Sequence, residues 1–204
     1  LAALSIRFFI SGLIGVLIAL ALGQSFKLTK SQWRATFVFG LCRNALYLGL
    51  NFVAMQSIEA SLAAIIASTM PLMVAFAGWL FVSDRLSPSG ILGLVLGFSG
   101  VTLIMWARLN QGVDIFGLVL CIIGALALTV ATLTLKDASS GGNIMMIVGL
   151  QMLIGSAALA VFCLLFENIH FTLNSSFVLA FAYTTIFPGL VATVVWFKLV
   201  NHIG

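Results

Sequence analysis

Charge is scarce in this sequence. Only 7% of its 204 residues are Asp, Glu, Lys or Arg, whereas hydrophobic residues make up 62%. A soluble domain carries about a quarter charged residues, because water must wet its surface. The scarcity of charge therefore excludes a soluble globular protein and predicts a chain that lies in a lipid bilayer.

Cysteine and histidine are also few. Cys42, Cys121 and Cys163 lie inside apolar runs without CxxC spacing, which favours buried thiols over a disulfide or a metal site. His170 and His202 are too few and too far apart to bind a metal ion. We therefore expect no metal centre.

Motifs of enzymes and of nucleic-acid-binding proteins are missing as well. The sequence has no HExxH, no Gly-rich phosphate loop, no carboxylate cluster and no Ser nucleophile with a nearby His. The nine basic residues are scattered rather than clustered, so no nucleic-acid partner is expected. We predict a protein that is not an enzyme and uses no cofactor.

Long apolar runs are what the sequence does contain. A helix needs about 20 apolar residues to cross a bilayer, and its backbone must form its hydrogen bonds internally there. The pattern predicts an all-α membrane protein, a polytopic helical bundle with short polar connections. The seven runs cover residues 3–22, 33–53, 60–82, 89–107, 115–135, 143–166 and 177–199.

The basic residues of the connections predict the orientation of the chain. Cytoplasmic loops of membrane proteins are enriched in Lys and Arg. One set of alternate loops holds most of the basic residues, whereas Arg108 stands alone on the other side. The basic set is Lys27, Lys30, Arg34, Arg85 and Lys136. We expect this side to be cytoplasmic in a bacterial inner membrane, with the first run starting outside.

Both ends of the sequence look cut. No initiator Met opens the chain, and apolar runs reach close to both ends. If the true N-terminus is cytoplasmic, an odd number of helices, most simply one, precedes residue 1. We expect an internal piece of a longer protein.

A weak internal repeat suggests the architecture. A shift of about 144 residues places residues 6–12 over 150–156, where a polar residue precedes an apolar run and a pair of small residues. A shift of about 145 places Phe52 over Phe197. Such a period contains five helices, and an odd number inverts the second copy in the membrane, as in many secondary transporters.

The segment 54–66, AMQSIEASLAAII, continues to Met70-Pro71-Leu72 and ends at Ser83-Asp84-Arg85-Leu86. It resembles the EamA-type proteins of the drug/metabolite transporter superfamily. There a short loop leads into a small-residue helix with a central proline and an acidic residue before Arg-Leu. The family more often has Glu where this chain has Asp84. Residues 6–8, Ile-Arg-Phe, and 196–204 resemble further parts of the family pattern.

The resemblance implies ten helices in two inverted five-helix repeats, of which this chain would hold about helices two to eight. Residues 1–109 would form the first repeat, with four helices visible and the first missing. Residues 110–204 would form the second, with three helices visible and the last two missing. The implied function is transport of small metabolites, amino-acid-like compounds or drugs by alternating access, with export as the favoured direction. A channel or a seven-helix receptor is the alternative.

Polar residues in the second run are the main candidates for substrate binding. Arg43, Tyr47 and Asn51 recur every four residues, with Asn44 beside them, so an α-helix would place them on one face. A polar residue at membrane depth is costly and usually has a partner or a function. We expect Arg43 to bind an anionic group of the substrate. The alternative is that carbonyls or a carboxylate of the bundle hold it.

Five further residues are candidates for binding or gating. Arg7 could line a cavity or extend to the membrane interface, and Gln151, its repeat counterpart, could line the same cavity. Trp196 could stack on a flat substrate or simply pack. Pro71 and Pro188 interrupt helices and could act as hinges or as static kinks.

Two local patterns concern the run at 89–107. Ser87-Pro88 is typical of a helix start, because Ser caps free N–H groups and Pro needs no donor in the first turn. Gly93, Gly97 and Gly100 share one face, which favours close packing of another helix. Packing within the chain is the simpler interpretation, and a homodimer is the alternative.

Overall fold

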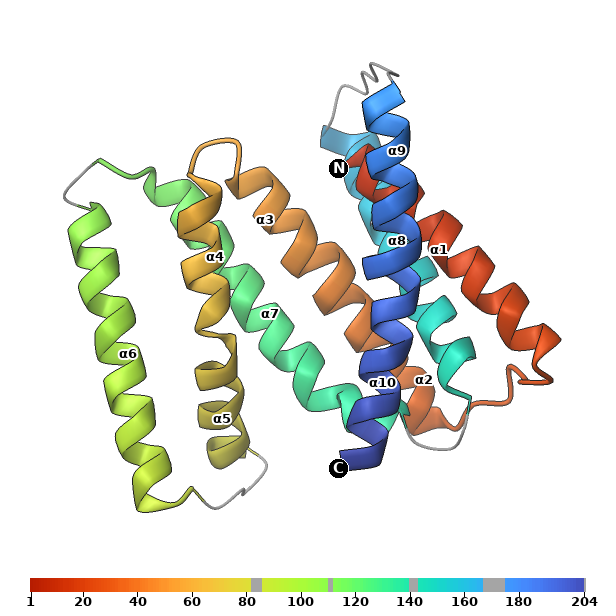
Figure 1. The fold of residues 1–204 in the computed structure, drawn as a ribbon, viewed down its shortest axis with the longest axis horizontal. Coiled ribbons are helices and arrows are strands. Elements are labelled where there is room, and N and C mark those ends of the chain that lie inside the picture. Colours follow the sequence, from red (N-terminus) through yellow and green to blue (C-terminus); the bar gives the residue numbers. More distant parts are fainter. Residues whose placement is uncertain (82–85, 110–111, 140–142, 167–174, 204) are drawn as a thin grey trace. The chain divides into compact units, whose positions relative to one another are not determined.

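The computed structural model describes residues 1–81, 86–109, 112–139, 143–166 and 175–203, and every regular element in these ranges is a helix (Figure 1). Within these described ranges, seven helical segments are long and apolar enough to cross a membrane. They are Ala2–Ala21, Lys30–Ala54, Ala60–Phe81, Pro88–Arg108, Ile115–Leu135, Ile144–Leu165 and Val178–Trp196. Each begins and ends within three residues of a predicted run. The predicted all-α polytopic bundle of an integral membrane protein is therefore confirmed.

The chain packs into two compact units. The first comprises Leu1–Ala45 and Thr134–Gly204, and the second comprises Leu46–Leu133. The division follows packing and does not test the predicted boundary between sequence repeats at residue 109. That boundary and the inverted repeats stay predictions.

The first unit is built around α1 and α8, which lie side by side (Figure 1). The second π-helix of the chain, η2, also packs against α1. The elements of this unit are α1 (Ala2–Ala21), α2 (Lys30–Phe39), most of the π-helix η1 (Gly40–Tyr47), the end of α7 (Ile115–Ser139), α8 (Ile144–Phe166), α9 (Ser175–Thr184), η2 (Thr185–Val191) and α10 (Ala192–Ile203).

Small residues let α1 and α8 approach closely, in antiparallel directions. Near the start of α1, the Ser5 hydroxyl donates to Ser156 O at 3.0 Å and the Ser156 hydroxyl donates to Ser5 O at 2.9 Å. Further along α1, a Cβ on Gly149 would lie 3.0 Å from Gly12 O. Hydroxyls and glycines are the residues that let membrane helices pack at short range.

The other end of this helix pair is closed by a side-chain cap. Gln24, just after α1, accepts a hydrogen bond at 2.9 Å from the backbone N–H of Met146. The bond satisfies one of the free N–H groups of the first turn of α8. Val16, Ala19 and Met146 are buried together beside it.

The second unit is built around a buried hydrophobic cluster. Its buried cluster joins α3, α4 and α7, with Ile58, Leu62, Ile66, Cys121 and Ala125 among its members. The elements of this unit are the end of η1, α3 (Leu48–Ala54), α4 (Ala60–Ser68), α5 (Met70–Phe81), α6 (Pro88–Leu109) and α7 as far as Leu133.

The span that contains Pro71 is interrupted at Thr69, between α4 and α5. Pro71 is the second residue of α5, a position that needs no backbone donor. The Thr69 hydroxyl donates to Ile66 O at 2.6 Å, and the Ser68 hydroxyl donates to Ile65 O at 2.7 Å. Side chains therefore satisfy carbonyls next to the break. The role of Pro71 as a hinge stays a prediction.

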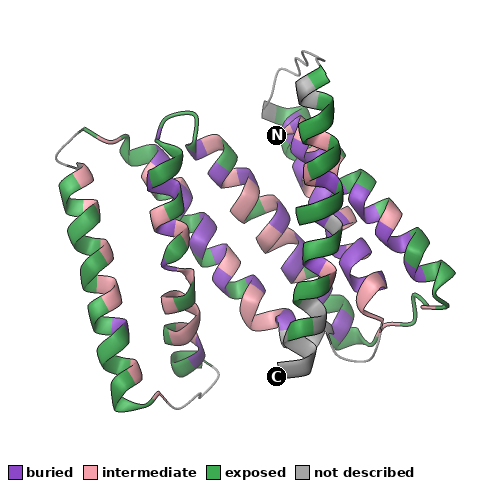
Figure 2. Ribbon diagram, viewed as in Figure 1, coloured by how far each residue is buried: buried purple, intermediate pink, exposed green. Residues whose placement is uncertain are grey.

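Helix α6 begins as the sequence predicts. Pro88 is its first residue, and the Ser87 hydroxyl accepts from the N–H of Gly90 at 3.1 Å. The helix packs along α5 but is exposed over most of its length (Figure 2). A Cβ on Gly97 would lie 2.6 Å from Leu72, so this glycine serves packing within the chain.

Gly93 and Gly100, the other two glycines of the predicted packing face, lie beside open space. A Cβ on Gly93 or Gly100 would meet no atom within 4 Å. A homodimer through this face stays a prediction.

All three cysteines are free thiols. Cys121 and Cys163 are buried, as predicted, and Cys42 is half-buried. Two other predictions cannot be compared with the fold: the Asp84-Arg85 ending of the family motif and His170 lie outside the described residues. The side chain of His202 is also outside them.

Candidate functional site

The second span changes from α-helix to π-helix where its polar residues lie. The π-helix η1 covers Gly40–Tyr47 and includes Arg43 and Asn44. π-Helical turns are rare in proteins, but many of those that occur lie at functional sites. The prediction from sequence assumed α-helical spacing and missed this segment. Gly40 opens it, and a Cβ there would lie only 2.5 Å from Gln151 O, so the wide turn starts where the backbone meets α8.

Arg43 lies in the middle of η1, half-buried in the first unit. Its Nη1 donates to the hydroxyl of Thr193, which follows η2, at 3.3 Å. Its guanidinium carbon lies 5.5 Å from the centroid of the Phe39 ring, within the range of a cation–π contact. Neither of these partners carries a negative charge, and the seven spans contain no Asp or Glu.

Asn44 and Gln151 bind each other between η1 and α8. The Asn44 amide nitrogen donates to Gln151 Oε1 at 2.6 Å and to Gln151 O at 3.0 Å. Their exposed fractions are 1% and 0%. Gly155 packs directly on Asn44, because a Cβ there would overlap Asn44 Cβ. The pair therefore fixes η1 on α8 at a close helix crossing.

The buried amide pair is incompletely satisfied. Asn44 Oδ1 and Gln151 Nε2 have no hydrogen-bond partner among the described residues. Leaving such an atom unpaired costs about 1–3 kcal/mol. A contact of either residue with substrate stays a prediction. The sequence showed both amides as polar residues within apolar runs, but it did not predict that they bind each other.

Tyr47 and Asn51 belong to the second unit. The Asn51 amide nitrogen donates to Tyr47 O at 2.8 Å, and the Cys121 thiol donates to Asn51 Oδ1 at 3.4 Å. A Cβ on Gly124 would lie 2.9 Å from the Asn51 amide, so α7 passes close to α3 here. The predicted common face with Arg43 crosses the division between units and stays a prediction.

Arg7 and Trp196 were also predicted to bind substrate. Arg7, on α1, is half-buried, and its guanidinium carbon lies 4.9 Å from the centroid of the Phe8 ring. Its Nε is buried and has no hydrogen-bond partner among the described residues. Trp196, on α10, is exposed. Neither is joined to Arg43 by a described contact, and their roles stay predictions.

Pro188 lies inside η2, the second π-helix. The Ser11 hydroxyl of α1 donates to Thr185 O at 2.9 Å, and the Thr193 hydroxyl donates to Pro188 O at 3.4 Å. The sequence pointed to Pro188 but not to Ser11 and Thr193, which look like ordinary hydroxyls of apolar runs.

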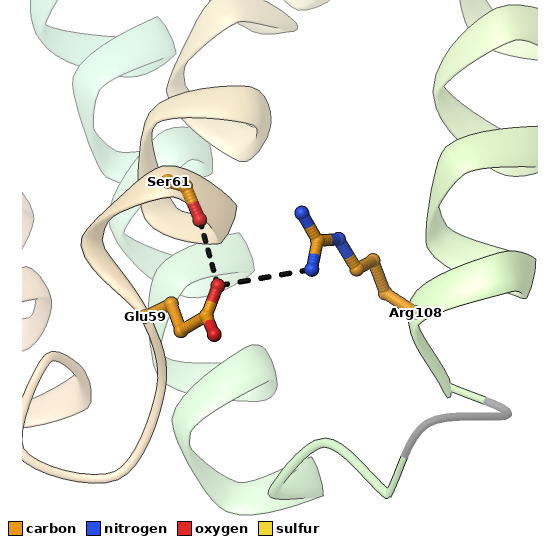
Figure 3. Close-up of polar contacts among 3 residues, drawn as sticks. All are labelled: Glu59, Ser61 and Arg108. Carbon is orange, nitrogen blue, oxygen red and sulfur yellow. Dashed lines mark hydrogen bonds and ion pairs between the residues drawn. The ribbon is translucent and has the colours of Figure 1, made fainter.

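A second polar cluster lies at one end of the second unit. Figure 3 shows Ser61 and Arg108 both pointing at the carboxylate of Glu59, which precedes α4. The Ser61 hydroxyl donates to Glu59 Oε2 at 3.0 Å, and Arg108 Nη1 lies 3.7 Å from the same oxygen. The side chains of Glu59 and Arg108 are 74% and 37% exposed, so this ion pair contributes little to stability.

A cavity of about 230 Å³ adjoins this cluster, with Asp114 and Ser57 on its wall. Within the described ranges, no group of three His, Cys, Asp or Glu side chains could hold a metal ion. The cluster therefore joins the start of α4 to the end of α6 through an exposed ion pair.

Asp114 caps the start of α7, outside the spans. Its Oδ2 accepts from the N–H of Gly117 at 2.9 Å. Hydrogen bonding by the Ser57 hydroxyl, and then by this N–H, holds the pKa of Asp114 below its ordinary value of 3.8. The negative charge also suits the positive end of the helix dipole.

Acid should therefore weaken this cap. Because the folded-state pKa is lowered, the stabilisation by Asp114 is complete above pH 3.8 and is lost as the pH falls through the folded-state pKa. Thermal unfolding in detergent from pH 6 to pH 3 should show a smaller loss of Tm for Asp114→Asn than for the wild type, since Asn caps without titrating. Equal losses in both proteins would contradict this role.

Comparisons with known proteins agree with the fold and the motif. Residues 1–106 match the model of the EamA-like transporter family. The uncharacterized transporter YvbV of Bacillus subtilis (strain 168) is 27% identical over 199 residues, which are 96% of this chain and 64% of that relative. The chain thus spans just under two thirds of the relative's length.

A solved structure, named only as a crystal structure of a protein, superimposes with a TM-score of 0.72 at 20% identity. The superposition covers 98% of this chain and 70% of that one, which shows a shared fold. The family match covers more than half of the chain and includes the motif at residues 54–72. This chain therefore belongs to the EamA-like transporter family, as its sequence motif predicted.

Proposed function

We propose that this protein is a secondary transporter that carries small molecules bearing an anionic group, with Arg43 as the residue that binds this group. Its family supports membrane transport in general. The observation that carries the proposal is the position of Arg43, a guanidinium in the middle of a span and inside a π-helix.

The charge of the spans favours an anionic substrate. The seven spans carry basic residues such as Arg43 but no Asp or Glu. An ionised group at membrane depth is costly and often marks a substrate pathway. A guanidinium matches a carboxylate or a phosphate with two parallel hydrogen bonds.

The transport cycle we propose is alternating access. The two predicted repeats, 1–109 and 110–204, would move against each other and open the binding site to one side of the membrane at a time. The break before Pro71 and the π-helix around Pro188 are the proposed hinges. Export of metabolites from a bacterium, across its inner membrane, is the proposed direction.

Uptake into proteoliposomes of the full-length protein tests the charge requirement. Labelled metabolites are offered as matched pairs, each acid beside its uncharged methyl ester or amide, with and without a pH gradient. We expect saturable flux of an acid and little flux of its neutral partner. Equal protein-dependent flux of both members of every pair would contradict the proposal.

A further inference from the structure

The hydroxyl of Thr193 connects the two π-helices of the first unit. It accepts a hydrogen bond from Arg43 Nη1 at 3.3 Å and donates to Pro188 O at 3.4 Å. Thr193 itself is 1% exposed. A hydroxyl has one donor and two acceptor positions, so it can make both bonds at once. The chain Arg43–Thr193–Pro188 thus runs from η1 to η2.

The first residue of η2, Thr185, is held by a different hydroxyl. Ser11 of α1 donates to Thr185 O at 2.9 Å and is itself buried. Gly189 lies against the same residue, because a Cβ there would be 3.0 Å from Ser11 Oγ. Ser11 and Thr193 both donate to carbonyls of η2. Of the two, Thr193 also accepts a hydrogen bond from Arg43, the residue that we propose binds the substrate.

The two bonds of Thr193 are long for hydrogen bonds. An O–H···O bond is usually 2.5–3.0 Å and an N–H···O bond 2.7–3.2 Å. A guanidinium can form two parallel hydrogen bonds with a carboxylate or a phosphate, which also carries the opposite charge, whereas the Thr193 hydroxyl is neutral and accepts a single bond from it. An anion beside Arg43 would therefore compete well with Thr193 for its N–H groups.

We infer that Thr193 is a positioning residue through which the anion at Arg43 controls η2. When the anion binds the Arg43 guanidinium, Thr193 loses the hydrogen bond from Arg43 Nη1. Its hydroxyl can then reorient away from Pro188 O. η2 then loses the side-chain bond at its middle residue, Pro188, while Ser11 still holds its first residue, Thr185. A short irregular segment that loses one of its two side-chain bonds is suited to act as a hinge. This inference rests on the proposed function of Arg43.

Thr193→Val tests the inference, since it replaces the hydroxyl with a methyl group of similar size. We expect kcat for the acid substrate to fall about threefold to tenfold, the effect of one lost hydrogen bond, while KM stays equal or falls. Thr193→Ser keeps the hydroxyl and should restore kcat. Thr184→Val is the matched control, because the described bonds of that hydroxyl go to two carbonyls of its own helix, Ala180 O and Phe181 O.

Hydrogen exchange of residues 185–191 distinguishes this role from a purely structural one, in which substrate would not change the exchange rate. In the wild type, saturating substrate should speed exchange in this segment. In Thr193→Val, exchange should be fast without substrate and should not change when substrate is added. The wild-type measurement alone tests the inference if the variant fails to fold, and unchanged exchange there would overturn it.

The outcomes separate this inference from the proposed function. If Thr193→Val behaves as the wild type, or if Thr193→Ser is impaired equally, the inference is overturned. The proposed function still stands in that case, provided that Arg43→Gln has lost transport. If Arg43→Gln transports the acid normally, the proposed function fails, and the inference fails with it.

Discussion

Replacing Arg43 with Gln should lower kcat/KM for an anionic substrate by about 10- to 100-fold, close to the background of empty liposomes. Gln is polar but carries no charge to bind an anion. Arg43→Lys keeps the charge and loses the planar fork that binds two oxygens. We expect it to retain part of the activity with a raised KM.

The matched control for Arg43→Gln is Arg34→Gln. Arg34 lies on the same span, in α2, but its side chain is exposed. Removal of its charge should leave uptake within about twofold of the wild type, as expected for an exposed charge with little effect on other groups. Folding of all variants is checked by size-exclusion chromatography in detergent. Normal uptake by Arg43→Gln would show that Arg43 does not bind the substrate charge.

Gly155→Ala should destabilise the first unit by about 1–3 kcal/mol. A Cβ at residue 155 would overlap Asn44 Cβ and would lie 3.0 Å from Gly40 O. The backbone of η1 cannot move away without breaking the bond from Asn44 to Gln151. A single methyl group should therefore separate α8 from η1 and leave buried amides unpaired.

Gly93→Ala is the control for this substitution. Residue 93 also lies within a helix, but a Cβ there meets no atom within 4 Å. Alanine should leave stability unchanged or raise it by up to about 1 kcal/mol, because it favours the helix. Thermal unfolding in detergent measures both variants. Equal Tm values for the two alanine variants would contradict the close crossing at Gly155.

The spans could be predicted from the sequence because their signal is local. Length and hydropathy locate each helix, and Ser87-Pro88 marks the start of α6 by the chemistry of its own first turn. The family motif could be recognised for the same reason, since its residues are contiguous.

The candidate site could be predicted only in part. Arg43 stands out in the sequence, because a charge in an apolar run is costly. Its bond to Thr193 joins residues 150 positions apart, and Asn44 and Gln151 are 107 positions apart. Pairs of this kind depend on how the helices pack, and apolar periodicity carries no information about it.

The π-helices were missed for a related reason. Sequence periodicity is read on 3.6 residues per turn, and η1 departs from it where Gly40 meets the backbone of α8. Gly40 can be read in the sequence, but its contact with Gln151 of α8 cannot. In η2 the proline is visible, whereas the hydroxyls that donate to its carbonyls come from Ser11 and Thr193 on other elements.

Alternating access between the two sides of the membrane can be tested by counterflow. Proteoliposomes of the full-length protein are loaded with unlabelled acid substrate, and uptake of a trace of labelled substrate is followed without any ion gradient. A carrier of this kind should show faster uptake with internal substrate and a transient accumulation of label above equilibrium. Label that only equilibrates, at a rate unaffected by internal substrate, would contradict alternating access and indicate a channel.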